Sequence, residues 1–433
     1  MSAKVKLRTI THSRFLACLG LAMAPALLGA ASSAVADETF APVAAISLPG
    51  NQKVQSFDIS FVDPLLGVYI LGDRTNQAVD VIDTSTNSVL AQLKGGFVGP
   101  TGNNDTSGPD GVLIVGHREV WVGDAPCVSG SAHPAPCAPI GSSSVKVINL
   151  FSQQLTHTIF TGGAARSDEL CLDPRHHLVL VANNADDPPF ASLISTTTYS
   201  VVKKIPFDGT NGAPKSNNGA EQCQWDHRTG KFYISIPGID GQPAGTGGVA
   251  VIDPVAMKVE TTFIIPLASC QAPQGMAIGP DHQILLGCNG DGGANHPTAV
   301  IDDRNGHVIK TLANESGSDM VWFNDGDDHY FLARSAAFGS NQLLGIVDAD
   351  SLKPDADVIT ANKSIAGRNA HSVAADPVLN QIYVPIPAGV SSICSAHGGV
   401  DANGCIAVFK SPHDDRPERL ADRFHDHDHD HDH

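Results

Sequence analysis

Basic residues are scarce in this chain of 433 residues. Lys and Arg number 27 against 45 Asp and Glu, which gives a formal net charge of −18 at pH 7. Four of the basic residues lie in the first 36 positions, so the chain that follows carries 23 against 45, a formal charge of −22. Such a surface repels nucleic acid and anionic membranes and attracts cations. We therefore expect no nucleic-acid partner and a preference for metal ions or other small ligands.

Several catalytic signatures are also absent. The chain has no GxSxG nucleophile elbow, no zinc-protease HExxH helix, no phosphate-binding glycine loop and no CxxCH haem-attachment motif. No haem is therefore expected, and a scaffold for a redox cofactor becomes a weak hypothesis.

The only long apolar run stands at the N-terminus. Phe15–Ala30 (FLACLGLAMAPALLGA) is followed by the small-x-small pattern Ala34-Val35-Ala36. The basic residues that precede the run are Lys4, Lys6, Arg8 and Arg14. This order predicts a Sec-type signal peptide over residues 1–36 with cleavage near Ala36. We expect a periplasmic or secreted protein with no stable membrane span after cleavage, because the run is short for a span.

A unit of about fifty residues recurs along the rest of the chain. Its first half, as in PQGMAIGPDHQILLGCNG from Pro273, occurs in seven copies and joins two apolar strands through an acidic turn. Its second half is a hairpin with a small polar turn, as in AVDVIDTSTNSVLAQL from Ala78. Alternating β-branched residues broken by turn formers are typical of short antiparallel strands. Four strands in each of seven repeats predict an all-β, seven-bladed β-propeller over residues 37–410.

The two ends of this region complement each other. After the seventh inner pair only one further strand remains, Cys405–Lys410. The missing outer strand is supplied by Pro42–Gly50 near the N-terminus, which would close the ring and cover a sheet edge. Residues 411–433 lie beyond that strand and are expected to be a disordered tail.

The repeat resembles a known family. YILGDRTNQAVDVIDTSTNSVLAQL, from Tyr69, is similar to the YVTN-type repeat, and PQGMAIGPDHQILL to its inner-strand partner. The likeness to these extracytoplasmic seven-bladed propellers, and to the lactonase-like propellers, covers nearly all of the mature chain. It implies the fold and little about the chemistry, since this architecture carries binding scaffolds, lactonases, lyases and cofactor-dependent proteins.

One residue of each repeat is expected at the mouth of the central channel, where the innermost strands of a propeller begin. Aligning the copies on the acidic turn selects Asp58, Asp110, Asp168, Glu221, Gln274, Asp319 and His371. In the third copy the register leaves Glu169 as the alternative to Asp168.

Carboxylates this close repel each other, so we expect raised pKa values or a shared cation. Oxygen donors with a single His suit Ca²⁺, Mg²⁺ or Mn²⁺. The predicted metal ligands are Asp58, Asp110, Asp168, Glu221, Asp319 and His371. A rim that is polar only because it is solvated explains the same residues and remains an alternative.

Two arginines follow second strands at the same face. Arg74 and Arg334, with Gln274, are predicted to bind a ligand, because a guanidinium beside an acidic mouth can orient an anionic group. The alternative is that each arginine pairs with a neighbouring Asp.

The cysteines favour disulfides. One of nine lies in the signal peptide, and an even number in an oxidising compartment indicates cross-links. Three pairs bracket loops or strands near the mouth, and elimination leaves a fourth. The predicted pairs are Cys127 with Cys137, Cys270 with Cys288, Cys394 with Cys405, and Cys171 with Cys223.

The chain ends in alternating His and Asp from residue 425. If the tail is extended, the histidines share one side of it. They could capture Zn²⁺, Ni²⁺ or Cu²⁺, and the alternative is an acidic solvating tail. The histidines are His425, His427, His429, His431 and His433.

Two functions are consistent with these features. The first is an exported propeller that binds a divalent metal or small ligand at its mouth, with a protein partner as a further possibility. The second is a metal-dependent hydrolase or lyase of the lactonase-like kind, with His371 as the catalytic proton carrier.

Overall fold

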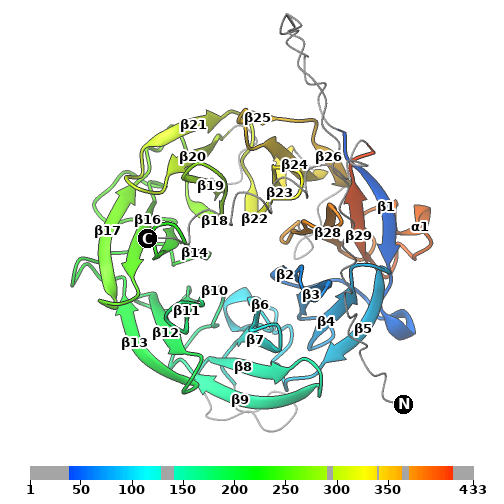
Figure 1. Ribbon diagram of the computed structural model, residues 1–433, viewed down its shortest axis with the longest axis horizontal. Coiled ribbons are helices and arrows are strands. Elements are labelled where there is room, and N and C mark those ends of the chain that lie inside the picture. The colour runs from blue at the N-terminus through cyan, green and yellow to red at the C-terminus, as the bar shows by residue number, and fades with distance from the viewer. Residues whose placement is uncertain (1–38, 128–140, 290–295, 339–340, 363–369, 413–433) are drawn as a thin grey trace, which may run out of the picture. The chain divides into compact units, whose positions relative to one another are not determined.

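The computed structural model describes residues 39–127, 141–289, 296–338, 341–362 and 370–412. They form seven antiparallel sheets arranged in a ring around a central axis (Figure 1). The predicted seven-bladed β-propeller is therefore confirmed. The predicted signal peptide and the histidines of the tail lie outside the described residues. No helix in the described part of the chain is long and apolar enough to span a membrane.

Blades 1 to 3 each run outward from the axis in sequence order. Blade 1 contains β2 (Ser60–Asp63), β3 (Val68–Asp73), β4 (Ala78–Asp83) and β5 (Ser88–Leu93). Blade 2 contains β6 (Val112–Val115), β7 (Glu119–Asp124), β8 (Ser144–Asn149) and β9 (Gln154–Phe160). Blade 3 contains β10 (Leu170–Asp173), β11 (Leu178–Asn183), β12 (Phe190–Ser195) and β13 (Ser200–Pro206).

Blades 4 to 6 follow the same order. Blade 4 contains β14 (Cys223–Asp226), β15 (Lys231–Ile236), β16 (Gly248–Asp253) and β17 (Lys258–Ile264). Blade 5 contains β18 (Pro273–Ile278), β19 (Gln283–Cys288), β20 (Thr298–Asp302) and β21 (Val308–Leu312). Blade 6 contains β22 (Ser318–Asn324), β23 (His329–Phe338), β24 (Asn341–Asp348) and an outer edge in two pieces, β25 (Lys353–Pro354) and β26 (Val358–Ala361).

Blade 7 joins the two ends of the described chain. It contains β27 (Ala374–Asp376), β28 (Gln381–Ile386), β29 (Cys405–Lys410) and, as its outermost strand, β1 (Ala41–Ile46). β1 runs antiparallel to β29, with Ala41 opposite Lys410 and Ile46 opposite Ile406. The predicted closure by the N-terminal strand is therefore confirmed, and it leaves β29 without an exposed edge. The short helices are η1 (Pro49–Asn51), η2 (Asn104–Thr106) and α1 (Ile393–Ala396).

Burial differs with position in the blade. All six residues of β3 are buried, whereas the outer strand β5 is exposed or half-buried except at Leu93. The middle strands are covered on both faces because apolar side chains of neighbouring blades pack between the sheets, as Val79 of blade 1 does with Val120 of blade 2. The turns after the inner strands are fixed by side chains. Asp63 Oδ1, for example, accepts the backbone N–H groups of Leu65 and Leu66 at 3.1 and 3.2 Å.

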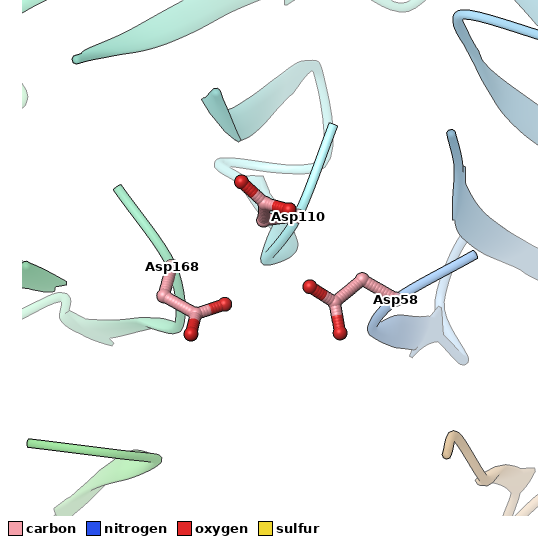
Figure 2. A group of neighbouring side chains, drawn as sticks. All are labelled: Asp58, Asp110 and Asp168. Atoms are coloured by element: carbon pink, nitrogen blue, oxygen red, sulfur yellow. The ribbon is translucent and has the colours of Figure 1, made fainter. Parts of the chain in front are cut away.

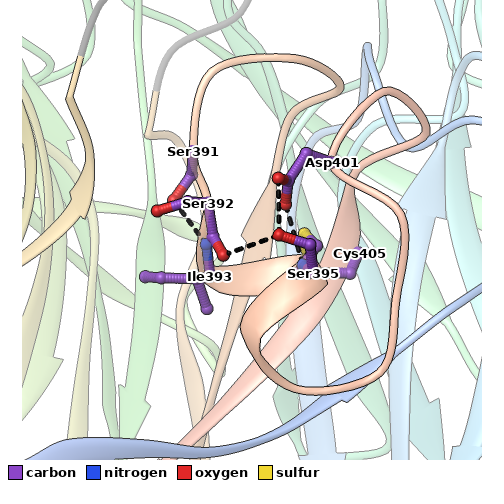
Figure 3. Close-up of a disulfide and its surroundings, with 7 residues drawn as sticks. Ser391, Ser392, Ile393, Ser395, Asp401 and Cys405 are labelled. Atoms are coloured by element: carbon purple, nitrogen blue, oxygen red, sulfur yellow. Dashed lines mark hydrogen bonds between the residues drawn. A yellow bond between two sulfur atoms is a disulfide. The ribbon is translucent and has the colours of Figure 1, made fainter.

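Three of the four predicted disulfides fall among the described residues and are confirmed: Cys171–Cys223, Cys270–Cys288 and Cys394–Cys405. Figure 3 shows the last of these beside α1, where Asp401 accepts hydrogen bonds from the backbone N–H and the hydroxyl of Ser395 at 2.8 and 2.6 Å. Cys137, the predicted partner of Cys127, lies outside the described residues. The three cross-links are consistent with an oxidising compartment.

The closing strand should contribute strongly to stability through Ile46. This side chain is 4% exposed and packs with Ile406 and with residues of blade 1, whereas Val43 in the same strand is 51% exposed. Ile46→Ala should lower the free energy of unfolding by about 2–5 kcal/mol, the usual cost of such a cavity, whereas Val43→Ala should change it by less than about 0.5 kcal/mol. Urea unfolding measures both, and equal losses would contradict a stabilising role of the closure.

Candidate metal centre at the propeller mouth

The mouth residues are placed by the same backbone irregularity in successive blades. In blade 1 the N–H of Asp58 donates to the carbonyl of Gly72 at 2.9 Å, and the N–H of Gly72 donates to the carbonyl of Ile59 at 3.0 Å. Two residues of the inner chain thus oppose one residue of the next strand, which is the arrangement of a β-bulge. The pattern recurs at Asp110, Asp168 and Glu221. A bulge redirects side chains at the end of a strand, and here it marks the position that the repeat alignment selects.

Glycines in or opposite the bulges allow the blades to approach closely. A Cβ atom at Gly72 would lie 2.6 Å from the backbone carbonyl oxygen of Asp110, and one at Gly111 would lie 2.2 Å from that of Asp168. Neither position has room for a side chain unless the backbone of the next blade moves. These glycines therefore help to set the spacing between consecutive acids of the mouth.

Three of the predicted ligands come together. Asp58, Asp110 and Asp168 lie on blades 1, 2 and 3 and point toward one another (Figure 2). One carboxylate oxygen of each lies within 4.8 Å of the others. All three residues are buried, with exposed fractions of 1%, 0% and 2%. We call this group the acidic triad.

Arg74 lies against the triad. Its Nε donates to Asp110 Oδ1 at 2.9 Å, its Nη2 pairs with the same oxygen at 2.5 Å and with Asp58 Oδ2, and its Nη1 donates to Asn104 Oδ1 at 2.7 Å. Of the two interpretations of Arg74, the geometry therefore favours pairing with neighbouring Asp residues. All three guanidinium nitrogens are engaged within the protein, so none is left to orient a ligand.

A second arginine was missed by the sequence analysis. Arg166 Nη2 pairs with Asp168 Oδ2 at 2.6 Å, and its Nη1 lies 3.7 Å from Asp58 Oδ2. Its backbone N–H donates to the carbonyl of Asp105 at 2.8 Å, which ties it to η2. The sequence feature that could have identified Arg166 is its position two residues before Asp168, in a chain with few basic residues.

His371 of blade 7 bridges two acids. Its Nδ1 lies 2.5 Å from Asp319 Oδ2 in blade 6, and its Nε2 pairs with Asp58 in blade 1. Burial alone would lower the pKa of His371, but Asp319 and Asp58 together raise it well above its usual value. The ring is therefore held as an imidazolium at neutral pH. It would have to lose a proton and turn before either nitrogen could bind a metal.

The carboxyl groups respond differently to their surroundings. Burial would raise the pKa of Asp58, but Arg74, His371 and Arg166 outweigh it and lower that pKa below its ordinary value. Burial raises the pKa of Asp168 to about 6 despite Arg166. Burial, then Asp168 and Asp319, raise the pKa of Glu221 to about 8.

Glu169, the alternative to Asp168, is buried beside the triad. Burial raises its pKa well above the ordinary value, and Asp168 and Asp58 add to this shift. Burial likewise raises the pKa of Asp110 well above its ordinary value, although Arg74 and Arg166 oppose the shift.

Three acceptor atoms of the mouth lack a partner. Asp110 Oδ2, Asp168 Oδ1 and Gln274 Oε1 are buried, and none has a hydrogen-bond partner among the residues that the structure describes. A buried acceptor without a partner is costly, so such atoms indicate an unseen water or ion. The triad therefore holds two buried carboxyl oxygens that accept no hydrogen bond from the described residues.

Arg334, the other predicted ligand-binding arginine, lies in blade 6 and is fully buried. Its Nη1 pairs with Glu315 Oε2 at 2.8 Å and with Asp357 Oδ2 at 2.7 Å. Its Nε donates to the carbonyl of Ser316 at 3.1 Å. These contacts connect successive segments of blade 6, and none of them reaches the triad.

No known protein-family model matches the chain, and the search among curated proteins likewise finds no match. The propeller fold is shown by the seven blades themselves. Membership of the YVTN-type or lactonase-like families rests on the repeat motifs and stays a prediction.

The raised pKa values predict a stability that falls with rising pH. Between about pH 5 and about pH 8, folded Glu221 keeps a proton that the unfolded chain, with its ordinary pKa of 4.5, has released. Unfolding then releases a proton, so the free energy of unfolding decreases as the pH rises through this window. In metal-free buffer Glu221→Gln should remove up to about 1.4 kcal/mol per pH unit of that slope. Denaturant unfolding at several pH values measures it.

The control for this prediction is Glu260→Gln on the outer strand β17, where the side chain is 53% exposed. The control should keep the wild-type slope. A Glu221→Gln protein with an unchanged slope would contradict the assignment of the bound proton.

Proposed function

We propose that this propeller binds one divalent cation at its mouth through the acidic triad. The observation that carries the proposal is the pair of buried, unpartnered carboxylate oxygens, Asp110 Oδ2 and Asp168 Oδ1, in a group whose ligand atoms lie within 4.8 Å of one another. Asp58 completes the triad and shares its own oxygens with Arg74 and His371. A bound cation would satisfy the two free oxygens at once.

The balance of charge supports the same conclusion. Around the triad the mouth gathers six carboxyl groups against three cationic groups, Arg74, Arg166 and His371. Ionised together, the acids would leave an excess of negative charge in a buried place. The protein on its own can relieve this excess only by keeping protons on some of the acids, as the raised pKa values of Asp168 and Glu221 indicate. A divalent cation relieves it directly.

The donor set favours a hard cation. Every available donor of the triad is a carboxylate oxygen. Such donors suit Ca²⁺, Mg²⁺ or Mn²⁺, whereas Zn²⁺ and Cu²⁺ prefer nitrogen and sulfur ligands. His371 was predicted as a ligand, and we now propose that it acts as a countercharge, because both of its nitrogens face carboxylates.

We do not extend the proposal to a hydrolase or lyase. His371, the predicted catalytic proton carrier, has both nitrogens against carboxylates, and an imidazolium with a raised pKa acts as an acid rather than as a base. His371 is the histidine that lies among these acids in the described part of the chain. The structure therefore gives no separate support for the catalytic alternative. Export from the cytoplasm, which depends on residues outside the described ones, stays a prediction.

The cation can be detected as a gain in stability. A variant that ends at residue 412, and so lacks the His/Asp tail, should bind one Ca²⁺ or Mn²⁺ per chain in calorimetric titration. If its affinity is about 100 μM, as in extracellular calcium modules, 10 mM Ca²⁺ should stabilise it by about 2.7 kcal/mol. Asp110→Asn should abolish this gain, because the amide can still accept from Arg74 while its NH₂ group replaces the free oxygen.

Asp80→Asn is the matched control. Asp80 is also a buried acid with a raised pKa, and its Oδ1 accepts from Gln92 at 2.8 Å, but it does not belong to the triad. It should keep the gain from Ca²⁺. A tail-free wild-type protein that neither binds nor is stabilised by any of the three cations would refute the proposal.

The role of Arg74 can be tested in the same way. Removing one partner of a buried ion pair leaves an uncompensated charge and costs about 3–5 kcal/mol. Arg74→Met should therefore destabilise the metal-free protein by about that amount, and saturating Ca²⁺ should restore more stability than it gives to wild type. Arg334→Met also removes a buried paired arginine, but outside the triad, so Ca²⁺ should add only the wild-type gain. Equal rescue of both variants would contradict the role of Arg74 as countercharge.

A further inference from the structure

The described disulfides differ in what they join. Cys270–Cys288 connects the approach to β18 with the end of β19 inside blade 5, and Cys394–Cys405 connects α1 with β29 in blade 7. Cys171–Cys223 connects the innermost strands of two different blades, β10 of blade 3 and β14 of blade 4. Among the described disulfides it is therefore the one that crosses a blade boundary.

This cross-link lies next to the acids of the mouth. Cys171 follows Glu169 by two residues, and Cys223 follows Glu221 by two residues. The Cα atoms of the two cysteines are 5.7 Å apart, and both side chains are buried in the apolar cluster between the blades. The bond thus joins the two inner strands two residues past the bulge of blade 3 and one residue past the bulge of blade 4.

The forces between these two blades oppose each other at this point. Apolar side chains such as Leu180 and Ile234 hold the blades together farther out. At the axis Asp168 raises the pKa of Glu221, and Glu221 raises that of Glu169, so ionising these buried carboxyl groups together would push the two blades apart. Arg166, which pairs with Asp168, lies in the segment before β10; its charge also lowers the pKa of Glu221, but among the described residues it forms no ion pair with blade 4.

We infer that Cys171–Cys223 is a positioning element of the metal centre. It holds the first residues of blades 3 and 4 at a fixed separation, so that Asp168 stays within reach of Asp58 and Asp110 while Glu221 remains beside it. Without the bond the acids can move apart and the site loses its geometry for a small cation. This inference rests on the proposed function, since positioning is measured here through cation binding.

The test compares two double variants of the tail-free protein. Cys171→Ala/Cys223→Ala removes the bond between blades, and Cys270→Ala/Cys288→Ala removes a bond inside one blade and serves as the control. Calorimetric titration with Ca²⁺ or Mn²⁺ should show at least a tenfold loss of affinity in the first variant and less than a threefold change in the second. Urea unfolding of both variants shows whether the loss merely follows a loss of stability.

A second readout needs no metal. Amide hydrogen exchange in metal-free protein should become faster over residues 167–171 and 219–223 in the first variant, while residues 273–288 keep the wild-type rate. If the first variant does not fold, Cys171→Val/Cys223→Ala replaces it, because valine refills part of the buried volume.

The outcomes separate the two proposals. Wild-type protein that binds a cation, together with a first variant that binds within threefold of it, overturns the positioning role and leaves the metal site intact. Wild-type protein that binds no cation overturns the proposed function, and the exchange rates then decide the positioning role: unchanged rates over residues 167–171 and 219–223 overturn it as well.

Discussion

Closure of the ring is the constraint on which the rest of this structure depends. Seven sheets that pack side by side around an axis bring the first residues of their inner strands to one place, whatever those residues are. In this chain most of them are acidic, and the same bulge places the acid at the start of each of blades 1 to 4. The apolar packing between blades supplies the stabilisation, and the accumulation of negative charge at the axis is its consequence.

The negative charge at the mouth is compensated only in part. Two arginines and one histidine pair with the carboxylates, and raised pKa values keep a proton on some of the acids. Two oxygens of the triad still have no partner among the described residues. Full neutralisation by side chains would have made a purely structural core. This incomplete compensation, in a group of carboxyl oxygens close enough to share one ion, is the observation on which the proposed cation site rests.

The repeat made most of the fold predictable, including the blade count, the closing strand and the register of the acids. Asp58, Asp110 and Asp168 could be predicted because each lies at a similar distance before the acidic turn of its repeat, and strand register fixes where such a residue falls in the blade. The pairing of His371 with two carboxylates could not, since it depends on side-chain direction across blade boundaries. Arg166 could not be predicted either, because it lies in a connecting segment that the repeat does not align. Arg334 was predicted to bind a ligand, but it forms ion pairs within blade 6 instead.

The pairing of β1 with β29 has a consequence for how the molecule is made. Ala41 and Lys410 stand at opposite ends of the folded sequence, so the final contact has to wait until nearly the whole chain has been synthesised. Until then the seventh sheet presents a bare edge, which is the kind of surface on which chains associate wrongly. We therefore expect the ring to close late in folding. The species most exposed to aggregation is an almost complete ring whose seventh sheet still lacks its outer strand.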